Sequence, residues 1–193
     1  MNKQILIGLV GEKGSGKTTL ASLLSENWTE LTFAYPVKKI ALAIAAGAVS
    51  QFDLHDPIQK ELYNEGIGMT NRKLMQIVGD LLREQLPIYF PTIFSPNIDA
   101  YSPIVVMARE SLRNAKQYGS NIIFTDVRYQ DEAKLIRSEG GMLVRIVRPF
   151  PMPIGAPDSH SSETHPKEIA VDLEIVNDGS REDMCSKFMK FLT

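Results

Sequence analysis

Eight residues near the start of the chain have the types and the spacing of a phosphate-binding loop. Residues 11–18 read Gly-Glu-Lys-Gly-Ser-Gly-Lys-Thr, which fits the pattern G-x-x-x-x-G-K-[ST] at every position. Its glycines let successive backbone N–H groups turn toward phosphate oxygens. Lys17 would reach the β- and γ-phosphates of a nucleoside triphosphate such as ATP, and the Thr18 hydroxyl would ligate Mg²⁺.

The setting of this loop distinguishes it from a glycine-rich turn that matches by chance. The apolar run at residues 5–10 has the character of a strand buried on both faces of a parallel sheet, and an apolar-patterned helix over 17–27 follows the loop. The sequence therefore predicts a nucleotide site. Its predicted contacts are Gly11, Gly14, Ser15, Gly16, Lys17, Thr18 and Thr19.

Two charged residues follow a later strand, which we predict at residues 122–125. Asp126 comes directly after this apolar run, at the edge where ligands of open α/β sheets collect. Its carboxylate could hold Mg²⁺ or accept the proton of an attacking group; the alternative is a residue that caps the next helix. Arg128 could reach phosphate, and its alternative is a solvated surface arginine.

Arg148 is a better candidate than Arg145 for contacting a phosphoryl group during transfer. Arg145 lies inside a predicted strand at residues 142–147, whereas Arg148 lies where the next segment begins. Phosphoryl transfer chiefly requires stabilisation of the charge on the equatorial oxygens. The predicted catalytic residues are Lys17, Asp126, Arg128 and Arg148.

A helix predicted over residues 72–85, with Asn71 as its cap, carries a candidate acceptor site. Arg72, Gln76 and Arg83 recur at separations of four and seven residues, so one helix face could present all three. Such a face could bind an acceptor phosphate through a bidentate arginine. The alternative is a solvated stripe. Lys38, on an earlier predicted helix, is a further candidate.

Residues 149–168 are rich in proline and polar side chains, and we expect a flap that closes over substrate. The segment also holds the potential metal ligands Asp158, His160, Glu163 and His165. Their irregular spacing and the absence of a nearby cysteine do not favour a zinc site.

Strands that alternate with helices must position these residues, which predicts a parallel α/β sheet with right-handed crossovers. Residues 50–70 and 87–103 are expected to be irregular. The predicted strands are 5–10, 31–34, 122–125, 142–147 and 173–176. The predicted helices are 17–27, 37–48, 72–85, 104–118, 131–139 and 181–192.

The composition is that of one soluble domain without a nucleic-acid surface. The chain has 193 residues and a formal net charge of −2, whereas duplex-binding proteins usually present a net basic face. A single cysteine, Cys185, excludes an intrachain disulfide, and the first apolar run is too short for a signal peptide or a membrane helix. We expect a cytoplasmic protein.

Beyond the phosphate loop, several ordered blocks resemble one enzyme family. They are residues 33–38, 72–80, 125–128 with Glu132, 144–149, 158–160 with Glu163, and 177–180. On these blocks the chain resembles the bacteriophage deoxynucleoside monophosphate kinases and, more distantly, animal phosphomevalonate kinase. Thr18 departs from the aspartate of many members, and the only basic side chain of residues 149–168 other than histidine is Lys167.

The resemblance implies a P-loop NTPase fold with five parallel strands, an acceptor-binding helical region over residues 36–118 and a lid over 149–168. It implies ATP and Mg²⁺ as cofactors, with Asn177 and Gly179 beside the adenine and Arg148 at the start of the lid. It also leaves a homodimer open. The acceptor-binding residues that it implies are Lys38, Arg72, Gln76, Arg83, Arg128 and Glu163.

The expected reaction moves the γ-phosphoryl group of ATP to a deoxynucleoside 5′-monophosphate, in the host cytoplasm if the chain is phage-encoded. Two alternatives remain at this point. The first is a kinase for another small phosphorylated metabolite or a modified nucleotide, and the second is a non-catalytic NTP-binding regulator.

Overall fold

A computed structural model describes the chain except for residues 1–3, 25–26, 57, 90–101, 150–164 and 193. The described chain divides into two compact units. The first, the sheet unit, comprises residues 1–32 and 109–193, and the second, the helical unit, comprises residues 33–108. Each unit is described by itself below.

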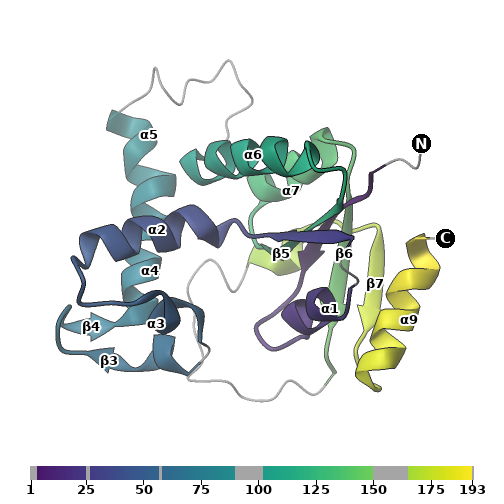
Figure 1. The fold of residues 1–193 in the computed structure, drawn as a ribbon, viewed down its shortest axis with the longest axis horizontal. Coiled ribbons are helices and arrows are strands. Elements are labelled where there is room, and N and C mark those ends of the chain that lie inside the picture. The colour runs from purple at the N-terminus through teal and green to yellow at the C-terminus, as the bar shows by residue number, and fades with distance from the viewer. Residues whose placement is uncertain (1–3, 25–26, 57, 90–101, 150–164, 193) are drawn as a thin grey trace. The chain divides into compact units, whose positions relative to one another are not determined.

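The sheet unit contains a five-stranded parallel sheet with the strand order β2-β5-β1-β6-β7 (Figure 1). This confirms the predicted sheet. The strands are β1 (Leu6–Val10), β2 (Trp28–Leu31), β5 (Asn121–Val127), β6 (Met142–Val147) and β7 (Leu173–Val176). The helices of the unit are α1 (Lys17–Leu23), α7 (Gln130–Ser138), the 3₁₀ turn η3 (His165–Glu168) and α9 (Arg181–Leu192).

Apolar residues on both faces of β1 hold helices against the sheet. Ile7 and Leu9 lie in a buried cluster that includes Leu20 of α1 and Phe188 of α9. On the other face α7 approaches so closely that a Cβ on Gly8 would lie 3.1 Å from a side-chain carbon of Ile136. β1 therefore lies between two helical layers (Figure 1), and its carboxyl end delivers the phosphate loop to one edge of the sheet.

The helical unit consists of short helices and one small hairpin. Helix α6 (Pro103–Lys116) runs from this unit into the sheet unit. The remaining elements are α2 (Ala34–Ile44), α3 (Gln51–His55), η1 (Gln59–Glu61), β3 (Tyr63–Asn64), β4 (Met69–Thr70), α4 (Asn71–Asp80), a π-helical turn η2 (Leu81–Gln85) and α5 (Leu86–Tyr89).

Residues 87–103 were expected to be irregular, but α5 extends to Tyr89. Four further predictions about local structure were wrong. The second strand is Trp28–Leu31, not 31–34, because Ala34 already begins α2. Residues 50–70, expected to be irregular, contain α3 with a capping box and the β3–β4 hairpin. Thr70, not Asn71, caps α4, since the Thr70 hydroxyl accepts the Lys73 N–H and Asn71 is the first helical residue.

The fourth wrong prediction concerns Asp126, which lies inside β5 and not after it. The cap of α7 comes instead from Glu132, whose buried carboxylate accepts the N–H groups of Arg128 and Tyr129 at 2.7 and 3.2 Å. Asp126 is therefore not the helix cap that was its alternative interpretation.

The π-helical turn η2 accommodates a proline within the continuous run from α4 to α5. Pro87 has no N–H to donate and its ring would clash with a carbonyl one turn earlier in a regular α-helix. The wider turn places the Leu86 N–H on the Leu81 carbonyl. Such turns are frequent at functional sites, and this one carries Arg83, a predicted acceptor ligand.

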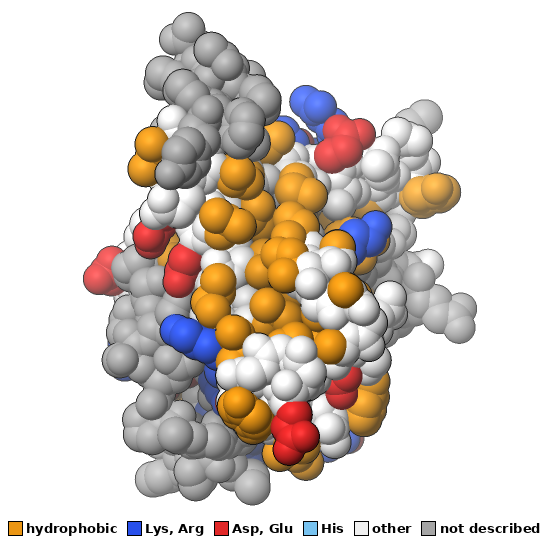
Figure 2. All heavy atoms as spheres, turned by 90° about the vertical axis from the view of Figure 1, so that its left-hand side faces the viewer, with side chains coloured by type: hydrophobic (Ala, Val, Ile, Leu, Met, Phe, Trp, Pro, Cys, Tyr) orange, Lys and Arg blue, Asp and Glu red, His pale blue; other side chains and the backbone are white. Residues whose placement is uncertain are grey.

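Exposed hydrophobic side chains gather on the face shown in Figure 2, with few charged groups among them. Large exposed hydrophobic residues of the helical unit include Ile44, Ile77, Leu81 and Ile88.

No helix in the described part of the chain is both long and apolar enough to cross a membrane.

Candidate phosphate-binding site

The phosphate loop joins β1 to α1 and requires glycine at its two ends. Gly11 and Gly16 have φ angles of 147° and 111°, which L side chains rarely adopt. A Cβ would lie 2.4 Å from the Ile146 carbonyl oxygen at Gly11, and 2.5 Å from the Asn177 side-chain nitrogen at Gly16. The loop is thus fitted against β6 and against the segment that follows β7.

Lys17 curls back over the loop from the first position of α1. Its Nζ donates to the carbonyl oxygens of Gly11 and Glu12 at 2.7 and 2.8 Å, and lies 3.5 Å from Ser15 Oγ. Only 9% of the residue is exposed. A buried ammonium needs such partners, and a phosphate oxygen reaching the loop would take the place of one of them. The role of Lys17 at the phosphates stays a prediction.

The neighbouring positions of the loop lie where the sequence predicts them. Ser15 is buried, Gly14 has a positive φ of 77°, and Thr18 and Thr19 follow Lys17 in the first turn of α1. The side chain of Thr18 belongs to an exposed residue, so its hydroxyl is accessible to a ligand.

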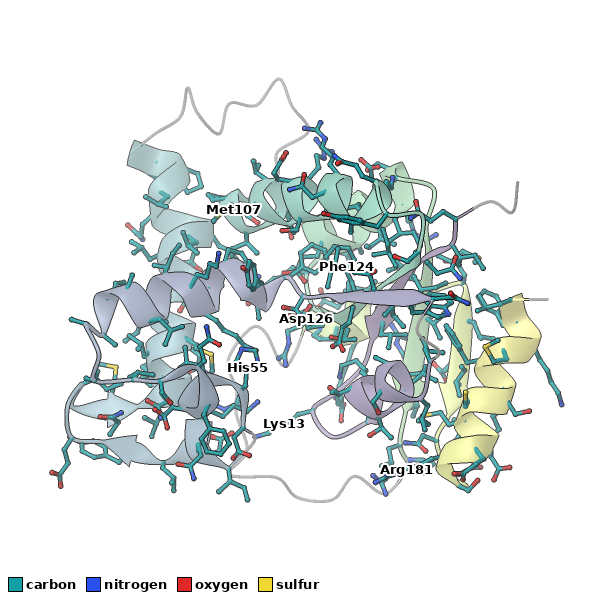
Figure 3. All side chains as sticks on the ribbon, in the orientation of Figure 1. Lys13, His55, Met107, Phe124, Asp126 and Arg181 are labelled. Atoms are coloured by element: carbon teal, nitrogen blue, oxygen red, sulfur yellow. The ribbon has the colours of Figure 1, made fainter. Side chains whose placement is uncertain are left out.

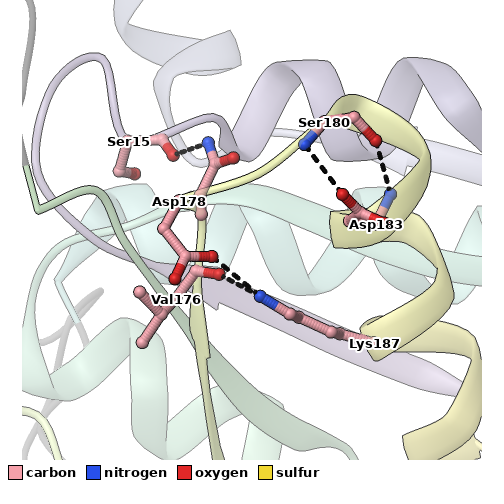
Figure 4. Close-up of polar contacts among 7 residues, drawn as sticks. Ser15, Val176, Asp178, Ser180, Asp183 and Lys187 are labelled. Carbon is pink, nitrogen blue, oxygen red and sulfur yellow. Dashed lines mark hydrogen bonds and ion pairs between the residues drawn. The ribbon is translucent and has the colours of Figure 1, made fainter.

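Asn177 fastens the phosphate loop to the segment after β7 (Figure 4). Its Nδ2 donates to the Ser15 carbonyl oxygen at 2.8 Å. A trans peptide is planar, so holding the Ser15 carbonyl on one side directs the Gly16 N–H to the opposite side. The sequence associated Asn177 with the adenine of ATP; the structure reveals this additional contact with the phosphate loop.

Two polar contacts hold the segment that carries Asn177 in place (Figure 4). Lys187 of α9 donates to the Val176 carbonyl at 2.8 Å and pairs with Asp178 at 3.0 Å. Its hydrogen bond is the main reason that the pKa of Asp178 is lowered. Ser180 and Asp183 cap α9 reciprocally, and hydrogen bonds from Ser180 lower the pKa of Asp183.

Gly179, the other residue associated with adenine, allows this cap to form. A Cβ at Gly179 would lie 2.7 Å from a carboxylate oxygen of Asp183. The cap and the Lys187 contacts together fix the path of the chain from β7 into α9, and with it the position of Asn177.

Asp126 lies on β5, the neighbour of β1 in the sheet. Val10 of β1 pairs with Val127, so the half-buried Asp126 lies at the edge of the sheet where the phosphate loop begins (Figure 3). Arg128 comes directly after β5 and is half-buried. The structure brings Asp126 and Arg128 to the edge that holds Lys17, as predicted.

Glu30 reaches the same edge of the sheet, although sequence reasoning did not select it. The Thr125 hydroxyl donates to Glu30 Oε1 at 2.9 Å. The two residues are far apart in the chain and meet only because β2 pairs with β5. No local pattern could have found this carboxylate.

A pocket of about 400 Å³ opens beside the phosphate loop. Its walls come from the loop, from the end of β6 and from η3. The lining residues are Gly11, Glu12, Lys13, Ser15, Arg145, Ile146, Val147, Arg148, Pro149, Pro166 and Lys167.

The two arginines of the β6 region have different surroundings. Both Arg148 and Arg145 line the pocket. The Nη2 of Arg145 also donates hydrogen bonds to the carbonyl oxygens of Pro166, Lys167 and Ile169. The preference for Arg148 over Arg145 agrees with this geometry.

In the helical unit, Arg72 is held by a carboxylate. Its Nε and Nη2 lie 2.7 and 2.6 Å from Glu61 Oε1, and 17% of its side chain is exposed. Gln76 and Arg83 are also half-buried, and an Arg83 nitrogen lies 3.3 Å from where a Cβ on Gly79 would be. These three side chains are more enclosed than a solvated stripe would be.

Lys38 contacts His55, a residue that the sequence did not select. Lys38 Nζ lies 3.2 Å from His55 Nδ1. Burial, followed by the charges of Lys38 and Lys60, lowers the pKa of His55. The lowered pKa favours the neutral imidazole beside the Lys38 ammonium.

Two sequence predictions fall on residues that the structure does not describe. Glu163 lies outside the described residues, as does most of the predicted lid. Three of the four potential metal ligands, Asp158, His160 and Glu163, are in the same segment. Within the described residues, no group of three or more His, Cys, Asp or Glu side chains could hold a metal ion.

Similarity to known proteins identifies the family. A protein of Acanthamoeba polyphaga mimivirus that carries the name of a deoxynucleotide monophosphate kinase is 33% identical, covering 96% of this chain and 94% of its own length. The chain belongs to the deoxynucleotide monophosphate kinase family. It is a phosphotransferase, and the family predicted from the sequence is confirmed.

A second relative agrees with this assignment. The deoxynucleotide monophosphate kinase of Escherichia phage RB69 is 25% identical, with 97% of this chain and 99% of that protein covered. Among solved structures, the fold is similar to TT1252 from Thermus thermophilus, at a TM-score of 0.50 and 16% identity, covering 99% of this chain and 97% of that one. No family model matches the chain.

Proposed function

We propose that this chain transfers the γ-phosphoryl group of ATP to a deoxynucleoside 5′-monophosphate, giving ADP and the diphosphate. The observation that supports it most strongly is the phosphate loop with Lys17 bound to its carbonyls, beside a pocket lined by Arg148 and Lys167. The names of the mimivirus and RB69 relatives supply the acceptor class.

The donor half of the reaction would use side chains of the sheet unit. Lys17 would contact the β- and γ-phosphates, and the fixed N–H groups of the loop would bind their oxygens. Arg148 would stabilise charge on the transferring group. Because transfer proceeds by in-line displacement, the residues position the reactants and neutralise charge without forming a covalent intermediate.

Mg²⁺ fits the oxygen donors present at this edge. It usually keeps several waters and takes one or two protein oxygens beside the substrate phosphates, and Thr18 and Asp126 offer a hydroxyl and a carboxylate. We propose these two residues as its protein ligands. When bound, the ion neutralises charge on the phosphate oxygens.

The acceptor half would use side chains of the helical unit. Arg72 has a guanidinium already oriented by Glu61, and a preoriented fork suits bidentate binding of a phosphate. Lys38, Gln76 and Arg83 are proposed as further acceptor contacts. Arg128 is proposed to contact the acceptor from the sheet unit, and Glu163 stays a predicted ligand.

The proposal is tested by ADP release from Mg-ATP in the presence of different acceptors. The panel contains the five common deoxynucleoside monophosphates, their ribose counterparts, a base-modified nucleotide and phosphomevalonate. We expect turnover that depends on a deoxynucleotide and is abolished by Lys17→Ala, with unchanged thermal unfolding of the variant. Slow ADP release that no acceptor accelerates would point to a regulator, and a response to phosphomevalonate alone would point to a metabolite kinase.

Three predictions about partners and location accompany this proposal. The formal charge of −2 gives no basis for duplex binding, and a cytoplasmic location stays a prediction. A homodimer also stays a prediction, which sedimentation velocity of the purified chain would test.

A further inference from the structure

Lys167 forms an ion pair with the phosphate loop itself. Its Nζ lies 2.9 Å from Glu12 Oε1, and the two side chains are 70% and 53% exposed. Glu12 is the second residue of the loop, whereas Lys167 lies in η3, just before the chain returns to the sheet in β7. The contact joins two distant parts of the sequence at the entrance of the pocket.

Arg145 fixes the backbone that carries Lys167. From its place on β6, its Nη2 donates to the carbonyls of Pro166 and Lys167 at 3.2 and 3.4 Å, and also to the carbonyl of Ile169. Its Nη1 lies 3.7 Å from Glu174 of β7. A half-buried guanidinium thus anchors η3 to the sheet. Lys167 therefore has a defined position although its own side chain is exposed.

Basic side chains outnumber acidic ones around the pocket, which favours binding of an anion. Among the described residues, Lys13, Arg145, Arg148 and Lys167 line it together with a single carboxylate, that of Glu12. Arg145 is committed to backbone carbonyls, as described above. Lys167 is held by one exposed carboxylate, and an exposed lysine–carboxylate pair contributes little free energy. A polyphosphate carries several negative charges and would compete effectively for that ammonium.

We propose that Lys167 is a ligand of the donor triphosphate, and that Glu12 holds its ammonium at the pocket until the nucleotide takes the place of the carboxylate. This inference rests on the proposed function, because it takes ATP as the donor. Lys167 would thus add a second cation outside the phosphate loop, beside Arg148. It is supplied by residues 149–168, which contain no arginine.

The exchange predicts a specific pattern of ATP affinities. In the wild type, binding ATP must break the pair between Glu12 and Lys167, whereas in Glu12→Gln there is no pair to break. Lys167→Met should therefore weaken ATP binding in both backgrounds, and more strongly in the Glu12→Gln background. The difference between the two losses measures the pair that ATP displaces.

The experiment is equilibrium titration of Mg-ATP at low salt and without any acceptor, on the wild type, Lys167→Met, Glu12→Gln and the double variant. We expect Lys167→Met to raise the Kd about fivefold, and about tenfold in the Glu12→Gln background, the extra factor of about two being typical of an exposed ion pair. Added salt should reduce both effects.

A second lysine–carboxylate pair provides the control. Lys116 and Glu139 form an ion pair that is less exposed, at 34% and 26%, in segments that lead into β5 and β6 and thus at the opposite edge of the sheet from the phosphate loop. Lys116→Met and Glu139→Gln should leave the Kd for Mg-ATP unchanged.

Three results would overturn the inference in different ways. An unchanged Kd in Lys167→Met, in both backgrounds, would reduce Lys167 to a surface ion pair. Equal losses in the two backgrounds would retain Lys167 as a ligand and exclude its exchange from Glu12. If the wild-type chain did not bind Mg-ATP, the proposed function would fall with the inference. Failure of acceptor turnover alone would not affect these titrations.

Discussion

Replacing Asn177 by alanine removes one hydrogen bond from the phosphate loop. The bond joins Asn177 Nδ2 to the Ser15 carbonyl at 2.8 Å and is partly buried. Without it, the peptide between Ser15 and Gly16 loses the partner that sets its plane. The Gly16 N–H can then turn away from the position in which it would bind a phosphate oxygen.

The size of the effect follows from the kind of bond that is lost. A hydrogen bond between neutral groups contributes a net of about 1 kcal/mol, within a range of about 0.5–1.5. If ATP binding must restore the lost orientation, Asn177→Ala should weaken Mg-ATP about fivefold, since about 1.4 kcal/mol corresponds to a factor of ten. Asn177→Asp should weaken it further, because an ionised carboxylate of similar size faces the Ser15 carbonyl.

The assay is calorimetric titration of Mg-ATP into the three proteins, with thermal unfolding measured on each. The expected order of affinity is wild type, then Asn177→Ala, then Asn177→Asp. Lys116→Met is the control, because Lys116 pairs with Glu139 at the opposite edge of the sheet and not with the loop. Affinities of both Asn177 variants equal to that of the wild type would refute the reasoning.

Three further predictions concern the two units. Arg148→Ala should lower kcat by about 10²-fold while changing the KM for ATP less, as for a group that acts mainly in the transition state; a change confined to KM would make it a ground-state ligand. Arg72→Ala should raise the acceptor KM by about tenfold or more, and an unchanged value would remove it from the acceptor site. His55 has a pKa lowered below its ordinary value of 6.5, so the unfolded chain binds its proton first as the pH falls. The stability that the neutral histidine contributes should be complete above pH 6.5 and decline below it; urea unfolding of the wild type and His55→Gln at several pH values should show the difference, and parallel curves would contradict it.

Elements with a strong local pattern were predicted closely. The strands Met142–Val147 and Leu173–Val176 and the helix Arg181–Leu192 have the bounds that the sequence indicates. Each combines an apolar pattern with a clear end, and the phosphate loop has a motif whose spacing is fixed by its chemistry. Such features are local, so one sequence is sufficient to find them.

Other elements depend on contacts that no local pattern contains. The second strand begins at Trp28 because it pairs with β5 through Trp28 and Asn121. Of the residues predicted as this strand, Leu31 is its last residue and Ala34 already begins α2. Helix α3 is a different case, since Ser50 and Asp53 form a capping box that was visible in the sequence. Residues 50–70 were predicted to be irregular because Pro57, Gly66 and Gly68 were given more weight than this capping box.

The site divides in the same way. The residues of the loop, Asp126 and Arg148 were found from motif and strand position. The contacts of Asn177 with Ser15 and of Lys167 with Glu12 span most of the chain, so only the fold brings them together. Arg145 was recognised as the weaker phosphate candidate, but its role in anchoring η3 required the structure.

The central claim is that the chain moves a phosphoryl group to a deoxynucleotide. The most direct test uses ATP that is labelled at its γ-phosphate and measures which product receives the label. The enzyme is incubated with each deoxynucleoside monophosphate and Mg²⁺ in turn, and the products are separated. The label should appear in a deoxynucleoside diphosphate for at least one acceptor, and Lys17→Ala should abolish its transfer. Label found only in inorganic phosphate, whatever the deoxynucleotide, would contradict the claim.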